Sequence, residues 1–142
     1  MKKSTLLFFA LFFASTIFGQ TADEKAVEQA MLNYIEGFYE GDTTKLIQCL
    51  HPKLSKYGYW KEESGEYHGS AMSFEGAKKY AKGVKEKGKF PSDDAPKKVE
   101  LYEVQDKTAC GKITAWWGTD YVLLAKLEGD WKITHVTWQG PN

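Results

Sequence analysis

The sequence KKVELYEVQDKTACGKITAWWGTDYVLLAKLEGDWKITHVTWQ, residues 97–139, decides the fold. It contains four apolar runs rich in Val, Ile, Thr, Tyr and Trp, the residues that fit a pleated, half-buried surface. The runs are separated by Asp106-Lys107, Gly118-Thr119 and Gly129-Asp130. Two-residue connections of this Gly and Asp type are typical of β-hairpins. Residues 97–139 therefore predict a four-stranded antiparallel meander.

Two-residue turns also fix which side chains share a face of this sheet, because register follows from loop length. The first predicted face carries Trp116, Tyr121, Leu123, Ala125, Val136 and Trp138. The second carries Ile113, Ala115, Trp117, Asp120, Val122, Leu124, Ile133 and His135. A β-bulge in any strand would exchange the two faces beyond it. Since both faces are apolar and helices of one chain can cover only one, a second copy of the chain is expected on the other.

The first twenty residues have the pattern of a secretory signal peptide. A basic start at Lys2-Lys3 is followed by an apolar run over residues 6–13 and small residues over 15–19. The apolar run is too short for a membrane span, and a buried N-terminal helix is the alternative interpretation. We expect residues 1–20 to be a signal peptide and residues 21–142 to form a single domain of a periplasmic or secreted protein, with no membrane segment after cleavage.

Charge excludes several classes of partner. The chain has 19 basic and 19 acidic residues, and every basic residue is Lys. No basic field that would bind nucleic acid is therefore expected. Without arginine, planar two-pronged recognition of a phosphate or carboxylate is not available either, which argues against nucleotide binding.

Cysteine and histidine provide no metal pattern. His51, His68 and His135 share no ligand spacing, and no metal or cofactor is predicted. Cys49 and Cys110 could form a disulfide in an oxidising compartment, or could remain two thiols among apolar neighbours. The sequence leaves both possibilities open.

Two helices are expected before residue 52. Thr21 and Glu24 form a capping-box signature. Behind it the apolar residues recur at helical spacing, at Val27, Ala30, Met31, Tyr34 and Phe38. Gly41 is expected to stop this helix, and Asp42 to cap a second one that Pro52 ends directly after His51.

A short hairpin and a third helix are expected next. The runs at residues 54–60 and 66–72 flank a polar turn at residues 62–65, which favours a hairpin. Ser73 then caps a helix that ends at Gly88 and Pro91. One side of this helix carries many lysines, which is typical of a solvated helix face.

This order of elements resembles the NTF2-like superfamily. The resemblance rests on LNYIEGFYEGDTTKLIQCLHP near the start and WWGTDYVLLAKLEGDWKITHVTWQ near the end, and it covers residues 22–139. Within the superfamily the chain is most similar to bacterial proteins described as putative lumazine-binding. The resemblance implies an α+β, NTF2-like (cystatin-like) cone, with three N-terminal helices packed on a curved antiparallel sheet of four to six strands. It also implies a pocket inside the cone and a homodimer through the outer sheet face.

Ketosteroid isomerases of this superfamily offer a test for catalysis. The resemblance places their oxyanion-hole tyrosine at Tyr34, their general-base aspartate at Gly58 and their second aspartate near Leu123. Proton abstraction needs a base, and an oxyanion hole needs its donors. Because both carboxylates are missing at these positions, isomerase chemistry is not expected.

Two other catalytic arrangements deserve weighing. Asp120 and His135 fall on one predicted face, but Asp120 lies opposite Gln139 and His135 opposite Leu124, too far apart for a hydrogen bond. His51 or His68 could act with Tyr57, as in dehydratase-like relatives, if tertiary contacts brought them together. No catalytic residue is predicted.

The remaining site is a pocket with aromatic walls and hydroxyl groups. Its candidate lining residues are Tyr34, Phe38, Tyr57, Tyr59, Trp116, Tyr121, Leu123 and Trp138. Such a pocket suits a flat, partly polar ring system through stacking and a few hydrogen bonds. The sequence therefore predicts a non-catalytic protein that binds a small aromatic molecule. A lyase or isomerase and a dimeric scaffold are the alternatives.

Overall fold

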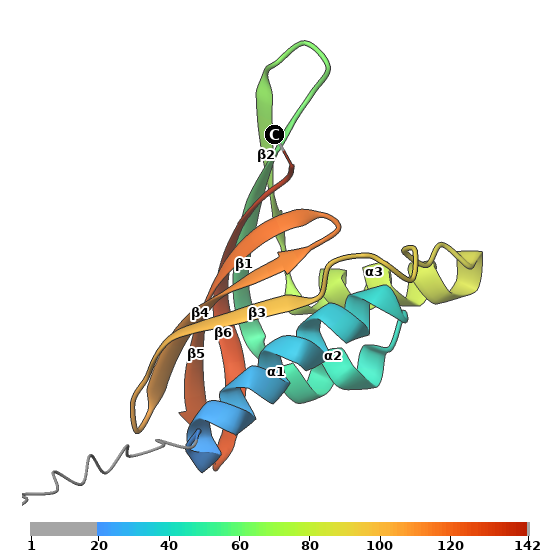
Figure 1. Ribbon diagram of the computed structural model, residues 1–142. Coiled ribbons are helices and arrows are strands. Elements are labelled where there is room, and N and C mark those ends of the chain that lie inside the picture. The colour runs from blue at the N-terminus through green and yellow to red at the C-terminus, as the bar shows by residue number, and fades with distance from the viewer. Residues whose placement is uncertain (1–19, 142) are drawn as a thin grey trace, which may run out of the picture.

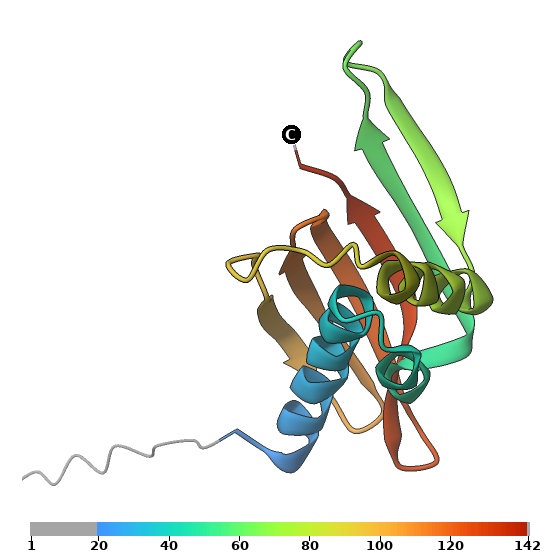
Figure 2. The ribbon, with the colours of Figure 1, turned by 90° about the vertical axis from the view of Figure 1, so that its right-hand side faces the viewer.

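The helices of this protein lie together on one face of a strongly curved sheet (Figures 1 and 2). The computed structural model describes residues 20–141, so that the predicted signal peptide lies, except for Gln20, outside the described residues. The three helices are α1 (Ala22–Tyr39), α2 (Thr43–Cys49) and α3 (Phe74–Lys87). The six strands are β1 (Leu50–Lys61), β2 (Tyr67–Met72), β3 (Lys98–Val104), β4 (Thr108–Ala115), β5 (Gly118–Leu127) and β6 (Asp130–Gln139). The expected α+β architecture is confirmed.

The sheet joins the predicted meander to the predicted hairpin. Its strand order is β2-β1-β6-β5-β4-β3, and every neighbouring pair is antiparallel except β1 and β6. These two strands run parallel, with Lys56 opposite Val136. The β1–β2 hairpin extends well beyond the helices, which gives the molecule its tall, open end (Figure 1).

The helix signals in the sequence act as expected. Thr21 and Glu24 form the capping box of α1, and the Asp42 carboxylate accepts hydrogen bonds from two backbone N–H groups of α2. Ser73 caps α3, and Gly88 ends it with a φ of +59°. The expected end of the second helix at His51 was wrong: α2 ends at Cys49, and His51 already belongs to β1.

Two of the three predicted turns lie elsewhere. Asp106-Lys107 connects β3 and β4 as predicted, since Gln105 N–H donates to the Thr108 carbonyl across it. The β4–β5 turn is Trp116-Trp117, and Gly118 pairs with Ala115 at the start of β5. The β5–β6 turn is Glu128-Gly129, and Asp130 pairs with Leu127 at the start of β6. A Cβ on Gly118 would lie 2.0 Å from the Gln139 carbonyl oxygen, so that this close approach requires glycine.

A bulge in β6 corrects the predicted faces of the sheet. Leu124 pairs with Ile133 whereas Leu123 pairs with His135, so that Thr134 is an extra residue. Because one extra residue turns all later side chains over, Val136 and Trp138 lie on the helix-covered inner face and His135 on the outer face. Val136 and Trp138 therefore lie on the opposite face from Tyr121 and Leu123, with which they were predicted to share a face.

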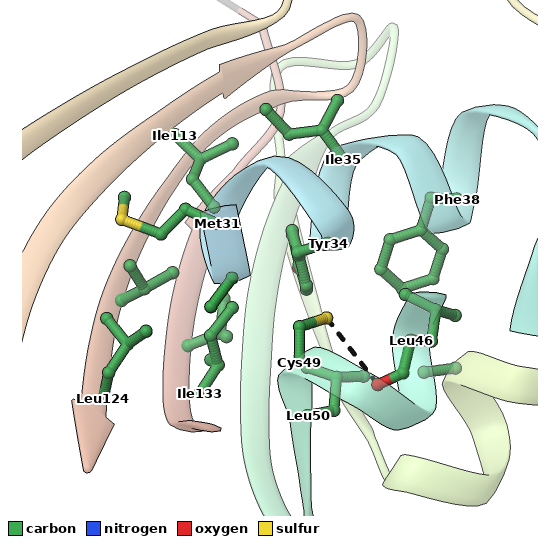
Figure 3. Packing of buried hydrophobic residues seen from close by; sticks show 14 of the residues in the cluster. Met31, Tyr34, Ile35, Phe38, Leu46, Cys49, Leu50, Ile113, Leu124 and Ile133 are labelled. Atoms are coloured by element: carbon green, nitrogen blue, oxygen red, sulfur yellow. Dashed lines mark hydrogen bonds between the residues drawn. The ribbon is translucent and has the colours of Figure 1, made fainter. Parts of the chain in front are cut away.

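The core lies between α1 and the inner face of the sheet (Figure 3). Met31 and Ile35 of α1 are fully buried, as are Ile113 and Ile133 of the sheet. Burial of each such side chain stabilises the fold by about 1.5–3 kcal/mol. This packed core fills one part of the space between the helices and the sheet, and a cavity occupies another part.

The two cysteines are free thiols. Cys49 is buried in the core, where its thiol donates to the Leu46 carbonyl oxygen at 3.6 Å (Figure 3) and burial raises its pKa to about 12. Cys110 lies opposite Leu123, on the outer side of the sheet. The sheet itself thus separates the two sulfur atoms.

Candidate ligand-binding cavity

An apolar cavity of about 350 Å³ opens on the inner face of the sheet, beyond the packed core. Its walls come from α1, β1, β2, α3, the β4–β5 turn, β6 and the residues after β6. They consist mainly of aromatic side chains and contain one charged group. The lining residues are Phe38, Lys56, Trp60, Met72, Tyr80, Trp116, Trp117, Trp138, Gly140 and Pro141.

The tryptophan turn in the cavity wall is held by a helix residue. The Tyr39 hydroxyl accepts a hydrogen bond from Trp116 N–H at 2.9 Å and donates one to the Pro96 carbonyl at 2.6 Å. Tyr39 is the last residue of α1, and its hydroxyl thus connects the β4–β5 turn to the loop before β3. The ring of Trp117 packs edge-on against those of Tyr34, Phe38 and Tyr39.

Lys56 is the charged group of the cavity. Side chains of a strand point alternately inward and outward, and in β1 the inward positions include Leu54, Lys56 and Gly58. All three are buried. The Lys56 side chain is only 6 % exposed. Its Nζ donates to the hydroxyl of Tyr34, which is fully buried on α1, at 2.5 Å.

Asp120 neutralises this buried lysine. It is the third residue of β5, fully buried, and its Oδ2 lies 3.7 Å from Lys56 Nζ. The Trp117 indole N–H donates to both carboxylate oxygens, at 3.1 and 3.2 Å. Asp120 pairs with Trp138 in the sheet. The register therefore brings an acid, a base and a hydroxyl together at the floor of the cavity.

Burial shifts the pKa of Tyr34, Lys56 and Asp120 in the direction that favours the neutral form of each group. It raises the pKa of Tyr34 well above its ordinary value, and nearby Asp120 raises it further. It lowers the pKa of Lys56, although the charge of Asp120 opposes the change. It also raises the pKa of Asp120 against the effect of Lys56. The difference in proton affinity between ammonium and carboxylate is thus smaller here than in water.

Aromatic rings surround the lysine. Its Nζ lies 5.2 Å from the ring centroid of Tyr34, 5.5 Å from that of Trp138 and 5.9 Å from that of Phe38. Cation–π attraction stabilises an ammonium group in such a setting. Gly58 makes room for one of these rings, because a Cβ at residue 58 would lie 1.7 Å from the Trp138 indole nitrogen.

The predicted lining residues divide between the two faces of the sheet. Phe38, Trp116 and Trp138 line the cavity, and Tyr34 lies directly beneath Lys56. The other four candidates do not line the cavity: their strand positions point outward, and their side chains are 43–55 % exposed. These four are Tyr57, Tyr59, Tyr121 and Leu123.

None of the three histidines lines the cavity. His135 is on the outer face and contacts Thr134, so that the sheet separates it from Asp120. His68 stacks on Trp60 and lies 3.4 Å from Glu62. Neither they nor His51 are among the residues that line the cavity.

The two positions matched to the ketosteroid isomerase carboxylates, Gly58 and Leu123, do not line the cavity. Leu123 points to the outer face, whereas the buried carboxylate beside Tyr34 belongs to Asp120. Gly58 lies under Trp138, and the group that reaches Tyr34 from β1 is the amine of Lys56. The site thus contains one tyrosine, one carboxylate and one amine.

Lys56 and Trp117 were missed as site residues from the sequence. The available signal was alternation: Lys56 stands between Leu54 and Gly58, two residues from each, as Asp120 stands two residues before Val122. Opposite charges at inward positions of two strands indicate a buried pair.

Among residues 20–141 no group of three or more His, Cys, Asp or Glu side chains could hold a metal ion. No helix in that range is long and apolar enough to cross a membrane.

Solved structures of NTF2-like proteins share this fold. An NTF2-like protein of unknown function from Shewanella baltica is 18 % identical, with a TM-score of 0.64 over 83 % of this chain and 93 % of its own. Another, from Silicibacter pomeroyi, is 18 % identical, with a TM-score of 0.66 over 82 % of this chain and 94 % of its own. At these identities the likeness concerns the fold alone.

A third structure bears the name of an enzyme. It is described as a putative scytalone dehydratase from Novosphingobium aromaticivorans, is 14 % identical, and has a TM-score of 0.59 over 83 % of both chains. No curated protein matches the sequence. The model of the family described as "putative lumazine-binding" matches residues 22–139. The chain therefore belongs to this family, and its fold is the one seen in NTF2-like proteins.

Proposed function

We propose that this protein binds a small, flat aromatic molecule that carries an oxygen acceptor on its ring. The single observation that supports this most directly is the ammonium group of Lys56 in an otherwise apolar, aromatic cavity of about 350 Å³. Four of the lining residues are tryptophans, which offer broad flat surfaces. The site is proposed to bind its ligand without turnover.

Lys56 sets the polarity of the proposed ligand. A lysine ammonium has three N–H donors, of which one is directed to Tyr34 and another faces Asp120. A third remains for a carbonyl or carboxylate oxygen in the cavity. A hydrogen bond to a charged donor contributes about 1.5–3 kcal/mol, so that an oxygen-bearing ring should bind better than the same ring without it.

Tryptophan fluorescence tests this proposal. Four of the five tryptophans line the cavity, and the fifth, Trp131, lies at the other end of the sheet, beside Asp23. We expect saturable quenching by flat ring compounds such as lumazine, riboflavin or 2-naphthoate, and weaker quenching by naphthalene. Trp138→Ala should weaken the response.

Tyr121→Ala is the matched control, because Tyr121 lies on the same sheet but on the outer face and is 55 % exposed. It should leave the titration unchanged. If no compound of the panel quenches in a saturable way, or if Tyr121→Ala weakens quenching as much as Trp138→Ala does, the cavity is not the binding site and the proposal fails.

A lyase or isomerase is the second candidate, and the shifted pKa values of Lys56 and Asp120 favour it. Perturbed acids and bases in a cavity are common at catalytic sites. Such an enzyme would exchange protons at the carbon next to a bound carbonyl group. In D₂O, NMR should then show faster deuterium uptake by 2-tetralone with the protein than with its Asp120→Asn variant. Equal rates would contradict this catalytic activity and leave ligand binding as the proposed function.

The outer sheet face supports a homodimer as part of this proposal. Tyr57 and Tyr121 flank Thr137 in one row across β1, β6 and β5, and Leu123 lies in the next row. These side chains are about half exposed, and a second copy of the same face would cover them. Sedimentation velocity should show a dimer that Tyr121→Glu dissociates. A monomer at micromolar concentration would contradict the pairing.

The proposed location is the periplasm or the cell exterior. Its support is the sequence pattern of residues 1–20 alone, with its basic start and apolar run. Mass spectrometry of the protein from its native cells should show a mature chain that begins close to Gln20. A chain that retains residues 1–19 inside the cell would contradict this location.

A further inference from the structure

We propose that Lys56 forms an imine with aldehydes or ketones attached to an aromatic ring, and so captures such ligands covalently in the cavity. This deepens the proposed function, because it assigns the ligand's oxygen to a reactive carbonyl group. Three observations support it: the position of Nζ, the groups that contact it, and the burial of the side chain.

Lys56 is the only amine among the described residues that line this cavity. Its side chain enters from the middle of β1, a strand held on both sides by β2 and β6. The amine is thus placed by rigid backbone rather than by a loop. A ring stacked against Trp138 or Trp60 would have its substituents at the cavity floor, where Nζ lies.

The neighbours of Nζ supply what imine formation requires. The Tyr34 hydroxyl contacts Nζ directly and also hydrogen-bonds Asp120, whose Oδ2 lies 3.7 Å from Nζ. It can therefore relay a proton from the Lys56 ammonium group to the carboxylate. Burial lowers the pKa of Lys56 and raises that of Asp120, which favours this transfer. Trp117 holds the carboxylate in place with its indole N–H.

The reaction balances without another reagent. The neutral amine adds its lone pair to the carbonyl carbon, and a proton passes from the nitrogen to the carbonyl oxygen to give a carbinolamine. Loss of that oxygen as water, with the proton that Asp120 had accepted, leaves a protonated imine. Overall, one ammonium group and one carbonyl compound give one iminium group and one water molecule. The iminium ion keeps the positive charge of Lys56, so that Asp120 still faces a cation.

The aromatic surroundings protect the product. Imines in water revert by hydrolysis, and the rings of Phe38, Trp138 and Tyr34 lie within 5.9 Å of Nζ. A ring-bearing ligand would fill the space above the amine. Lysines on the surface have no such cover, and their imines should reverse quickly.

Reductive trapping tests the proposal on the unaltered protein. The chain is incubated with 2-naphthaldehyde and sodium cyanoborohydride, and the fraction of each lysine labelled is measured by peptide mass spectrometry. We expect Lys56 to be labelled at least tenfold faster than Lys79 and Lys82 of α3, with a rate that saturates in aldehyde. Urea-unfolded protein should lose this preference.

Labelling spread evenly over the lysines, or a Lys56 rate that does not saturate, would overturn the imine. Because this readout compares lysines within one protein, it does not depend on a variant that folds. Tyr34→Phe and Asp120→Asn should slow labelling of Lys56 while that of Lys79 stays unchanged.

The same samples separate this inference from the function on which it rests. 2-Naphthoate has the same ring but cannot form an imine. Quenching by 2-naphthoate without selective labelling by 2-naphthaldehyde would retain the binding site and refute the imine. Loss of both would refute the two proposals together.

Discussion

A lysine, an aspartate and a tryptophan are in contact at two places in this molecule, and the pKa of the aspartate is shifted in opposite directions at the two. At the cavity, Trp117 donates to Asp120, which faces Lys56. At the other end of the sheet, Trp131 donates to Asp23 at 3.0 Å, and Lys126 donates to it at 2.7 Å. In each set a lysine, an aspartate and an indole N–H are in contact.

Solvent makes the difference between the two sets. The side chains of Lys126 and Asp23 are 27 % and 36 % exposed, whereas those of Lys56 and Asp120 are 5 % and 0 % exposed. The hydrogen bond from Lys126 lowers the pKa of Asp23, while burial raises the pKa of Asp120. The contacts alone do not decide the role. The exposed set fastens α1 to the β5–β6 hairpin, whereas burial lowers the pKa of the amine in the buried set.

Removal of the buried acid should have the largest effect. Asp120→Ala leaves the Lys56 ammonium group buried without a counter-charge. Loss of one partner of a buried pair costs about 3–5 kcal/mol. Urea unfolding at pH 7 should show a decrease of this size in the free energy of unfolding.

The double variant Lys56→Met with Asp120→Asn is the control for this prediction. It removes both charges, and its asparagine oxygen still accepts from the Trp117 indole N–H. Since an apolar replacement of a buried pair is often neutral or stabilising, the double variant should be more stable than Asp120→Ala. If the two are equally unstable, the pair is not coupled as the geometry indicates.

Gly58→Ala should have the next largest effect, because it displaces an aromatic ring that covers the buried lysine. The new methyl group overlaps the Trp138 indole. Overpacking of this kind costs about 1–3 kcal/mol, and movement of Trp138 should also weaken ligand quenching. Gly129→Ala is no suitable control, because Gly129 has a φ of +93°. Gly83→Ala is suitable, since nothing lies within 4 Å of its added Cβ.

Asp23→Asn should have the smallest effect, and its pH dependence distinguishes the exposed set from the buried one. The folded-state pKa of Asp23 is lowered below the ordinary 3.8. Asp23 therefore adds stability above that pH, and this contribution is lost as the pH falls through its folded pKa. Thermal melts should show a slightly lower Tm for Asp23→Asn at pH 6 and a smaller difference at pH 3. A difference that grows toward pH 3 would contradict this sign.

Much of the fold could be predicted from local signals. Thr21, Asp42 and Ser73 cap their helices through hydrogen bonds to residues two or three positions later in the chain. The residue patterns that form such bonds can be recognised in a sequence. Asp106-Lys107 forms a turn for the same reason. The bulge at Thr134 could not be predicted, because no local residue pattern marks it and only the pairing with β5 reveals it.

The candidate site was harder to predict for the same reason. Phe38 and Trp138 were expected in the cavity and lie there, but the β6 bulge left Tyr121 and Leu123 on the other face. Lys56 went unnoticed because a lysine on a strand is usually solvated. Its burial depends on Asp120, more than sixty residues later in the chain, which only the tertiary structure brings within reach.

The parallel pairing of β1 with β6 also determines when the cavity can form. Lys56 lies opposite Val136, about 80 residues further along the chain, and contacts so distant in sequence close slowly during folding. While the protein is being synthesised, β1 has only β2 as a neighbour, and Lys56 has neither Asp120 nor Trp138 beside it. Gly140 and Pro141, which complete the wall, follow the last strand of the sheet. The reactive amine is therefore enclosed only after β5, β6 and these two residues have been synthesised.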